Sequence, residues 1–147
     1  MDSHERIEIM RKTIFYVVFV AASLLAAPAM AGDYVIITNK ANTNAVDKDF
    51  VAKIYKGEAK SWPNGDSVAA YDLPEDNPAR VAFAQGVTGK SVSQMKALWG
   101  QLVFSGKAVP PKKMDSDDDV KKAVASNKGA VGYISAASAD GSVKVTK

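Results

Sequence analysis

FVAKIYKGEAKSWPNG, residues 50–65, is the stretch of sequence that decides the fold. It holds two adjacent apolar pairs, Phe50-Val51 and Ile54-Tyr55, which lie one helical turn apart and therefore share one face of a helix. Gly57 follows the second pair, at a position where helices often end on a residue with positive φ. The pattern predicts an amphipathic helix that ends at this glycine.

The second half of the stretch predicts a turn that leads into a strand. Trp62 is followed by Pro63-Asn64-Gly65, a combination typical of tight turns because glycine tolerates the backbone angles that they need. The next residues, Ser67-Val68-Ala69-Ala70-Tyr71, have the apolar character of a strand. A helix that returns to a strand in this way is typical of the second half of a βαβ unit.

The N-terminal region has the composition of a secretory signal peptide. Residues 11–31, RKTIFYVVFVAASLLAAPAMA, place two cations before an apolar run and end in the small-x-small sequence Ala29-Met30-Ala31. The apolar run is shorter than the roughly 20 residues of a spanning helix, and an uncleaved anchor is the alternative. We expect residues 1–31 to be a cleaved leader, with translation starting at Met1 or Met10, and residues 32–147 to be exported as one domain.

Composition excludes several functional classes. The chain has no cysteine, and its only histidine, His4, lies in the expected leader. A mature chain without His or Cys lacks most nucleophile–base pairs and most zinc ligands, so we expect no enzyme activity, no metal and no cofactor. The net charge of +3 is too small and too dispersed to predict binding to nucleic acid.

Apolar runs and helix signals predict an α/β domain with about four strands and four flanking helices. The expected strands are residues 34–38, 68–73, 130–134 and 143–146. Each helix is expected to begin at a short polar residue whose side chain can accept a bond from a free backbone N–H. These residues are Asp47 or Asp49, Asn77, Ser91 and Ser116.

Five segments, taken together and in order, resemble a known family. They are ITNKANTN, FVAKIYKGEAKSWPNG, ARVAFAQGVTGKS, LWGQLVFSGKAVPP and NKGAVGYIS. The set resembles the phosphate-binding-protein-like family of periplasmic solute-binding proteins, and most of all its short, single-lobe members. The resemblance implies one lobe of the type II periplasmic-binding-protein fold, a periplasmic location and association with a phosphate ABC transporter. In two-lobed relatives this block is the second lobe, and the ligand lies between the lobes.

The sequence departs from the family at the residues that hold the anion. In two-lobed members the second lobe supplies an Arg and a Ser-Gly-Thr at a helix N-terminus, where free N–H groups face the oxyanion. Here the second expected strand leads into residues 72–78, DLPEDNP, with no Ser-Gly-Thr. Its three carboxylates repel a phosphate dianion, and Pro78 removes an N–H donor. The usual phosphate chemistry of the family is therefore not expected unchanged.

Two groups of polar residues are candidates for ligand binding. Arg80 is the only arginine in residues 32–147 and opens a helix beside the expected cleft, where its guanidinium suits an oxyanion. The alternative is a salt bridge with Asp76 or with Asp72, which belongs to the same candidate group. The second group follows the first strand at its carboxyl end, where open α/β sheets place ligands, with ordinary turn and capping roles as the alternative. Its members are Thr38, Asn39, Asn42, Thr43 and Asn44.

Other conspicuous residues favour structural roles. Trp62 and Trp99 are expected to pack, and three aspartates at 117–119 suit a helix N-terminus better than a metal site because neighbours on a helix do not face one point. One loop combines three lysines with two prolines and is either a contact for an acidic partner or simply solvated: Lys107, Pro110, Pro111, Lys112 and Lys113.

Two functions fit these observations. The first is a periplasmic binding module for a small oxyanion such as phosphate, which passes it to a membrane permease or signals to a sensor protein. One lobe offers half a pocket, so a homodimer or a second protein would supply the other half. The second function is a ligand-free adaptor that docks on a membrane sensor or channel. No spacing of carboxylates, or of Ser and Lys, singles out an enzyme site.

Overall fold

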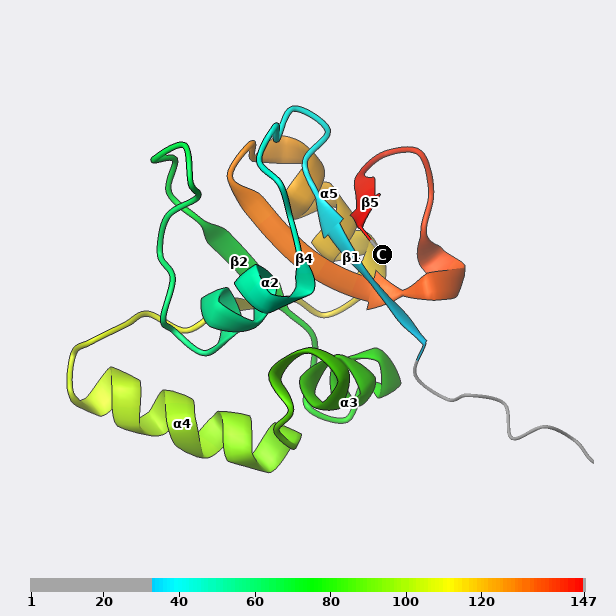
Figure 1. Cartoon of the computed structure of the whole chain (residues 1–147). Helices are drawn as coiled ribbons and strands as arrows, with labels where there is room; N and C mark the ends of the chain where they lie inside the picture. The colour runs from blue at the N-terminus through cyan, green and yellow to red at the C-terminus, as the bar shows by residue number, and fades with distance from the viewer. Residues whose placement is uncertain (1–32, 147) are drawn as a thin grey trace, which may run out of the picture. The chain divides into compact units, whose positions relative to one another are not determined.

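A five-stranded mixed sheet organises residues 33–146, the part of the chain that the computed structural model describes (Figure 1). The expected leader, residues 1–31, lies outside the described residues. The strand order across the sheet is β3-β2-β4-β1-β5. The strands are β1 Tyr34–Thr38, β2 Ala69–Asp72, β3 Lys112–Lys113, β4 Ala130–Ser135 and β5 Lys144–Thr146.

Short polar residues begin each of the four α-helices in residues 33–146, as the sequence predicts. The side chain of Asp47 accepts a hydrogen bond from the backbone N–H of Phe50 at 2.7 Å, and Ser91 and Gln94 cap each other's backbone N–H groups. A π-helical turn, η1 Ala84–Thr88, directly follows helix α3, Pro78–Phe83. A 3₁₀ turn, η2 Ala136–Ser138, follows β4. The α-helices are α2 Lys48–Tyr55, α3 Pro78–Phe83, α4 Val92–Phe104 and α5 Asp117–Ser126.

The helices cover the sheet on two faces. Gly132 of β4 faces α5, where a methyl group in place of its hydrogen would lie 2.7 Å from a methyl carbon of Val120. The next residue, Tyr133, points to the other face and stacks on Phe83 at the end of α3. Alternate residues of one strand thus pack on helices on opposite sides, and the α/β fold class predicted from the sequence is confirmed (Figure 1).

The stretch 50–65 has the predicted local structure. Gly57 has φ of 78°, and it follows α2 directly after the cap residue. Trp62 is 2% exposed, and its indole N–H donates to the carbonyl of Gly129 at 2.9 Å. Position 129 also needs glycine, because a Cβ there would lie 2.3 Å from the carbonyl oxygen of Ser67. The helix, the turn and the tryptophan therefore fix where β2 begins.

The βαβ interpretation of this stretch is wrong. β1 pairs with β4 in the antiparallel sense, whereas β2 pairs with β4 in the parallel sense. The strands before and after α2 therefore run in opposite directions, with β4 between them. The same local pattern of helix and turn can lead into a strand of either direction. The direction of β2 relative to β1 is decided only when each pairs with β4, which lies some 60 residues after β2 in the chain. The parallel connections are instead β2 to β3, through α3 and α4, and β3 to β4, through α5.

The structure has one strand more than the sequence predicts. The sequence predicts a loop at the lysines and prolines after α4, but Lys112 and Lys113 form β3, which pairs with Tyr71 and Asp72 at the edge of the sheet. A two-residue strand of lysines has no apolar pattern to reveal it. None of the helices within residues 33–146 has both the length and the apolar character needed to span a membrane.

Candidate functional site

The candidate site lies where β2 ends. Asp72 is the last residue of β2, and the parallel register with β4 places it beside Tyr133. One carboxylate oxygen of Asp72 accepts hydrogen bonds from the Tyr133 hydroxyl and from the backbone N–H of Leu73. The other oxygen lies 3.2 Å from Nη2 of Arg80. The strand end and the following turn thus hold a carboxylate that contacts three donor groups, two at one oxygen and one at the other.

Arg80 reaches this carboxylate from the first turn of α3. Asn77 caps the helix by accepting from the N–H of Ala79, and Pro78 occupies the first helical position. The guanidinium donates through Nη1 to the carbonyl of Leu73 at 2.7 Å, and its side chain is 11% exposed. Of the two salt-bridge partners considered from the sequence, Asp72 is the one that the structure pairs with Arg80.

Three aromatic rings form the wall behind this ion pair. The rings of Phe83 and Tyr133 are stacked with centroids 3.9 Å apart, and Tyr55 meets Phe83 edge-on at 4.7 Å. Burial, followed by the charge of Asp72, raises the pKa of both tyrosines well above the ordinary value. Both hydroxyls therefore stay protonated and act as donors, Tyr133 to Asp72 and Tyr55 to the carbonyl of Tyr71 at 2.6 Å.

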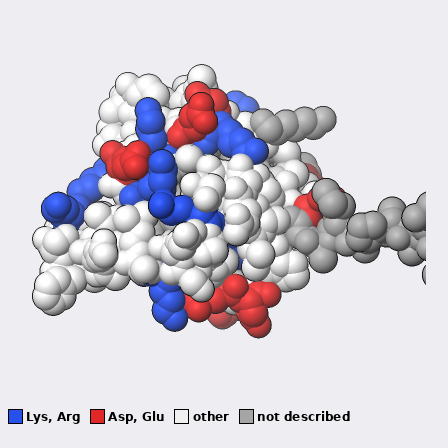
Figure 2. All heavy atoms as spheres, turned by 60° about the horizontal axis from the view of Figure 1, so that its bottom comes forward, with Lys and Arg blue, Asp and Glu red and all other residues white. Residues whose placement is uncertain are grey.

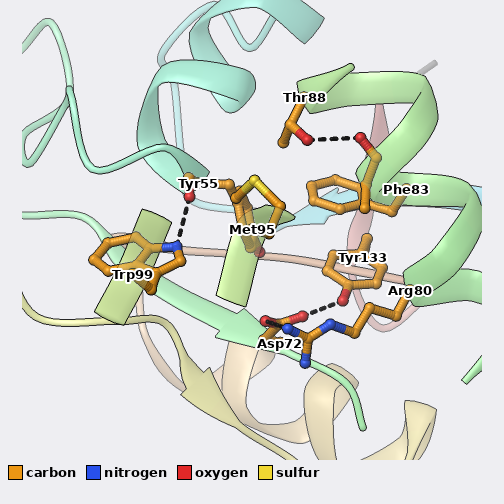
Figure 3. Close-up of a pocket in the computed structure, with 9 residues that line it drawn as sticks. Tyr55, Asp72, Arg80, Phe83, Thr88, Met95, Trp99 and Tyr133 are labelled. Atoms are coloured by element: carbon orange, nitrogen blue, oxygen red, sulfur yellow. Dashed lines mark hydrogen bonds and ion pairs between the residues drawn. The ribbon is translucent and has the colours of Figure 1, made fainter. Parts of the chain in front are cut away.

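A small cavity opens between the ion pair, the aromatic wall and α4 (Figure 3). Its volume is about 20 Å³, which is enough for about one water molecule. In Figure 3 Asp72, Arg80 and Tyr133 point toward one another at one side of the cavity, while Trp99 donates from the other side to the carbonyl of Tyr55 at 2.9 Å. The lining residues are Tyr55, Asp72, Arg80, Phe83, Ala84, Thr88, Met95, Trp99 and Tyr133.

Two of the three carboxylates in residues 72–78, those of Asp72 and Glu75, contact cations. Glu75 lies 3.3 Å from the ammonium of Lys96 and 3.8 Å from that of Lys113. Its hydrogen bond with Lys96 lowers the pKa of Glu75 below the ordinary value. Together with the Asp72–Arg80 pair, these contacts weaken the repulsion that the sequence predicts for an incoming anion.

The second group of candidate residues lies at the other end of the sheet. In the antiparallel register Thr38 pairs with Val131, near the start of β4, whereas Asp72 lies beside Tyr133 farther along it. The carboxyl end of β1 is thus at the amino ends of β2 and β4. One pocket cannot contain both groups, because strand direction and not order along the chain decides which ends share an edge of the sheet.

The three asparagines of this second group make turn and capping contacts. Asn39 donates to the carbonyls of Val124 and Ala125, both at 2.9 Å, and so caps the C-terminus of α5. The side-chain oxygen of Asn42 accepts from the N–H of Asn44 at 2.9 Å. The remaining two residues differ in burial: Thr38 is fully buried, and its hydroxyl has no partner among the described residues, while Thr43 is exposed.

Sequence reasoning missed the aromatic part of the site. Tyr133 lies in an apolar run that indicates a core strand, and Phe83 and Tyr55 lie on apolar helix faces. Nothing in their spacing distinguishes a site wall from the core. No group of three or more metal-ligating side chains is found within the described residues 33–146.

Comparison with known proteins gives a family match and three similar folds. The profile of a family described as "PBP superfamily domain" matches residues 10–147. An ABC-type phosphate transport receptor from Vibrio cholerae is 23% identical, with a TM-score of 0.59 over 79% of this chain and 46% of that chain. A Clostridium perfringens protein assigned as a phosphate ABC transporter substrate-binding protein, solved with bound phosphate, is 22% identical, with a TM-score of 0.61 over 80% and 46%.

A third structure, of a possible phosphate-binding protein from Planctomyces limnophilus, is 16% identical, with a TM-score of 0.53 over 71% of this chain and 36% of that chain. The chain thus spans less than half the length of the three structures that it matches. None of the curated proteins compared matches it. At these identities the likeness is one of fold.

Proposed function

The chain belongs to the PBP superfamily domain family, and from this premise we propose that it is an exported solute-binding module for a small oxyanion. Phosphate is the first candidate ligand, and an ABC transporter with its membrane permease is the system that the module would serve. The fold shared with phosphate-binding proteins from Vibrio cholerae and Clostridium perfringens supports this choice. The localisation that we propose is the periplasm, reached through the leader at residues 1–31.

The observation that carries the proposal is the Asp72–Arg80 pair at the carboxyl end of β2. Arg80 has five N–H groups, and only two of its nitrogens are engaged, at Leu73 and Asp72. The remaining N–H groups can donate to oxyanion oxygens. The carboxylate of Asp72 next to them can accept from a hydroxyl. Donor groups of Arg80 next to the acceptor Asp72 match hydrogen phosphate, because this ion carries oxygens that accept hydrogen bonds as well as a hydroxyl that donates one.

The same geometry favours phosphate over sulfate. At neutral pH sulfate has no hydroxyl, so it cannot satisfy a neighbouring carboxylate and would be repelled by it. The cavity of about 20 Å³ is too small to enclose either ion. The ion would therefore bind at the mouth of the cavity, and a second surface would cover it. We propose that a second copy of the chain or the permease supplies that surface.

Isothermal titration calorimetry with phosphate and sulfate tests this function. We expect phosphate to bind more tightly than sulfate, Asp72→Asn to reduce that preference, and Arg80→Lys to weaken the binding of both ions because lysine cannot keep two contacts while facing an anion. Lys122→Ala is the matched control, since it removes a positive charge from an exposed position of α5 and should leave both affinities unchanged.

A ligand-free adaptor is the second candidate function. It is favoured by one observation, that Asp72 balances the charge of Arg80 within the protein itself. Absence of heat with both ions, or phosphate binding that Asp72→Asn and Arg80→Lys leave unchanged, would reject the proposed site and favour the adaptor. Export needs a separate test, which is N-terminal sequencing of the mature protein. We expect its first residue to be Gly32.

A further inference from the structure

A second and much larger hollow lies on the other side of Trp99. It has a volume of about 860 Å³ and is bounded by the end of α2, the start of β2, the end of α4 and the chain that follows α4. We call it the α4 groove. Its lining is mostly aliphatic, with small side chains and two prolines among seventeen residues that include Val68, Ala69, Ala70, Val103, Val109 and Pro110.

Several apolar side chains at the edge of the α4 groove are exposed. Val103 is 51% exposed and Val109 is 88% exposed, and Phe104 beside them is 95% exposed. Met95 is the only buried residue of α4, and Lys96 is its only charged residue. Figure 2, which turns the bottom of Figure 1 toward the viewer, shows a broad uncharged surface with basic groups, and some acidic groups among them, along its upper side. A soluble domain rarely exposes apolar side chains in such a cluster without a partner.

The groove has the shape of a site for extended chain. β3 pairs with β2 only at Tyr71 and Asp72, so among the described residues the first half of β2 has no strand beside it on this side. Pro110 and Pro111 lie just before β3 and help line the groove opposite that half of β2. One side of the groove is formed by β2, and the other side by the end of α4 and the loop that follows it. An extended segment fits such a space, whereas a flat membrane surface does not fill a concave one.

The charged residues of the groove are all positive. Lys60, Lys107 and Lys112 line it, and no aspartate or glutamate does. None of these lysines makes a salt bridge with another described residue, and the ammonium of Lys60 donates to the carbonyl of Lys107 across the groove. A positive rim around an apolar floor attracts acidic groups and repels basic ones. A second copy packed with the same groove on its two-fold axis would bring these lysines together, which disfavours it as the occupant.

We propose that the α4 groove binds an extended segment of a partner protein in which aliphatic residues are flanked by acidic residues. The aliphatic side chains cover Val103 and Val109, and the acidic side chains pair with Lys107 and Lys112. This mode combines an apolar floor with a charged rim, an arrangement common to peptide-binding grooves. The inference goes beyond the proposed solute site, because it involves none of the contacts of Asp72 or Arg80.

Selection from random peptides displayed on phage, with residues 32–147 immobilised, tests the proposal. We expect enriched peptides to combine aliphatic runs with flanking acidic residues. Fluorescence anisotropy with a labelled enriched peptide should show that the double variant Lys107→Glu/Lys112→Glu weakens binding about tenfold, because two attractions become repulsions. Val109→Asp should also weaken binding. It changes a side chain that is 88% exposed, so it leaves the fold intact.

Lys48→Glu is the control for charge, since Lys48 is exposed on α2 and does not line the groove. It should leave the affinity for the peptide unchanged, and phosphate calorimetry should give the same result for all three variants. No enrichment, or enriched peptides that bind the groove variants as tightly as the wild type, would overturn the proposal. So would binding only to vesicles that contain phosphatidylglycerol, or a concentration-dependent dimer that Val109→Asp dissociates, because each identifies another occupant.

Discussion

The pairing of Asp72 and Arg80 predicts a large loss of stability when the guanidinium alone is removed. Arg80→Met keeps most of the aliphatic stem but removes the charge, the contact with Asp72 at 3.2 Å and the donor to Leu73 at 2.7 Å. Removing one partner of a buried ion pair costs about 3–5 kcal/mol, because it leaves an uncompensated charge. We expect about 3 kcal/mol here, since Asp72 keeps the donors from Tyr133 and Leu73.

A double-mutant cycle separates the charge from the packing. Asp72→Asn removes the negative charge but can still accept from the same two donors. In the Arg80→Met background it should therefore be much less destabilising than in the wild type, with a coupling of about 1–2 kcal/mol. Urea denaturation followed by circular dichroism gives the free energy of unfolding for all four proteins.

Two results would refute this reasoning. If Arg80→Met costs less than about 1 kcal/mol, the guanidinium behaves as a surface group. If the two substitutions are additive, Asp72 and Arg80 are not coupled in the folded protein. A loss of about 3 kcal/mol is a large share of a typical stability of about 5–15 kcal/mol, which is why the calorimetric test of phosphate binding uses Arg80→Lys.

Three further predictions concern the scaffold. Above pH 10 the free energy of unfolding should fall by about 2.7 kcal/mol per pH unit. The reason is that Tyr55 and Tyr133 ionise in the unfolded chain but keep their protons in the folded protein, where their pKa values are raised. Urea denaturation at several pH values should show this slope halved in Tyr133→Phe. Gly129→Ala should destabilise by about 1–3 kcal/mol in thermal melts, since its Cβ would lie 2.3 Å from the carbonyl oxygen of Ser67. Ser91→Ala should cost about 1 kcal/mol and speed amide exchange in the first turn of α4, whereas Ser93→Ala should not.

Local features were predictable because their causes are local. A short acceptor such as Asp47 or Ser91 caps a helix through backbone groups two or three residues away, so its role can be recognised in sequence. Gly57 is likewise determined by the helix that it ends. The family resemblance reached further, because it relied on the order of five segments, and the family match confirms it.

The arrangement of the candidate site could not be predicted in the same way. The sequence suggested Arg80 and gave Asp72 as one of two partners, and it suggested five polar residues after β1 as well. Whether these groups meet depends on the direction of β1, which is decided by antiparallel pairing with β4 almost a hundred residues away. The sequence contains no local signal for that pairing.

By itself, then, the sequence determined the α-helices and four of the five strands within residues 33–146, where these helices begin, and that neither imidazole nor thiol is available to this part of the chain. The tertiary structure alone decided that Asp72, Arg80 and Tyr133 meet and that Thr38 and Asn39 lie at the opposite end of the sheet. It also decided that α4 exposes its apolar end beside a row of lysines. The reason is physical: capping and periodicity act over a few residues, whereas strand direction and burial depend on contacts between segments that are distant in the chain.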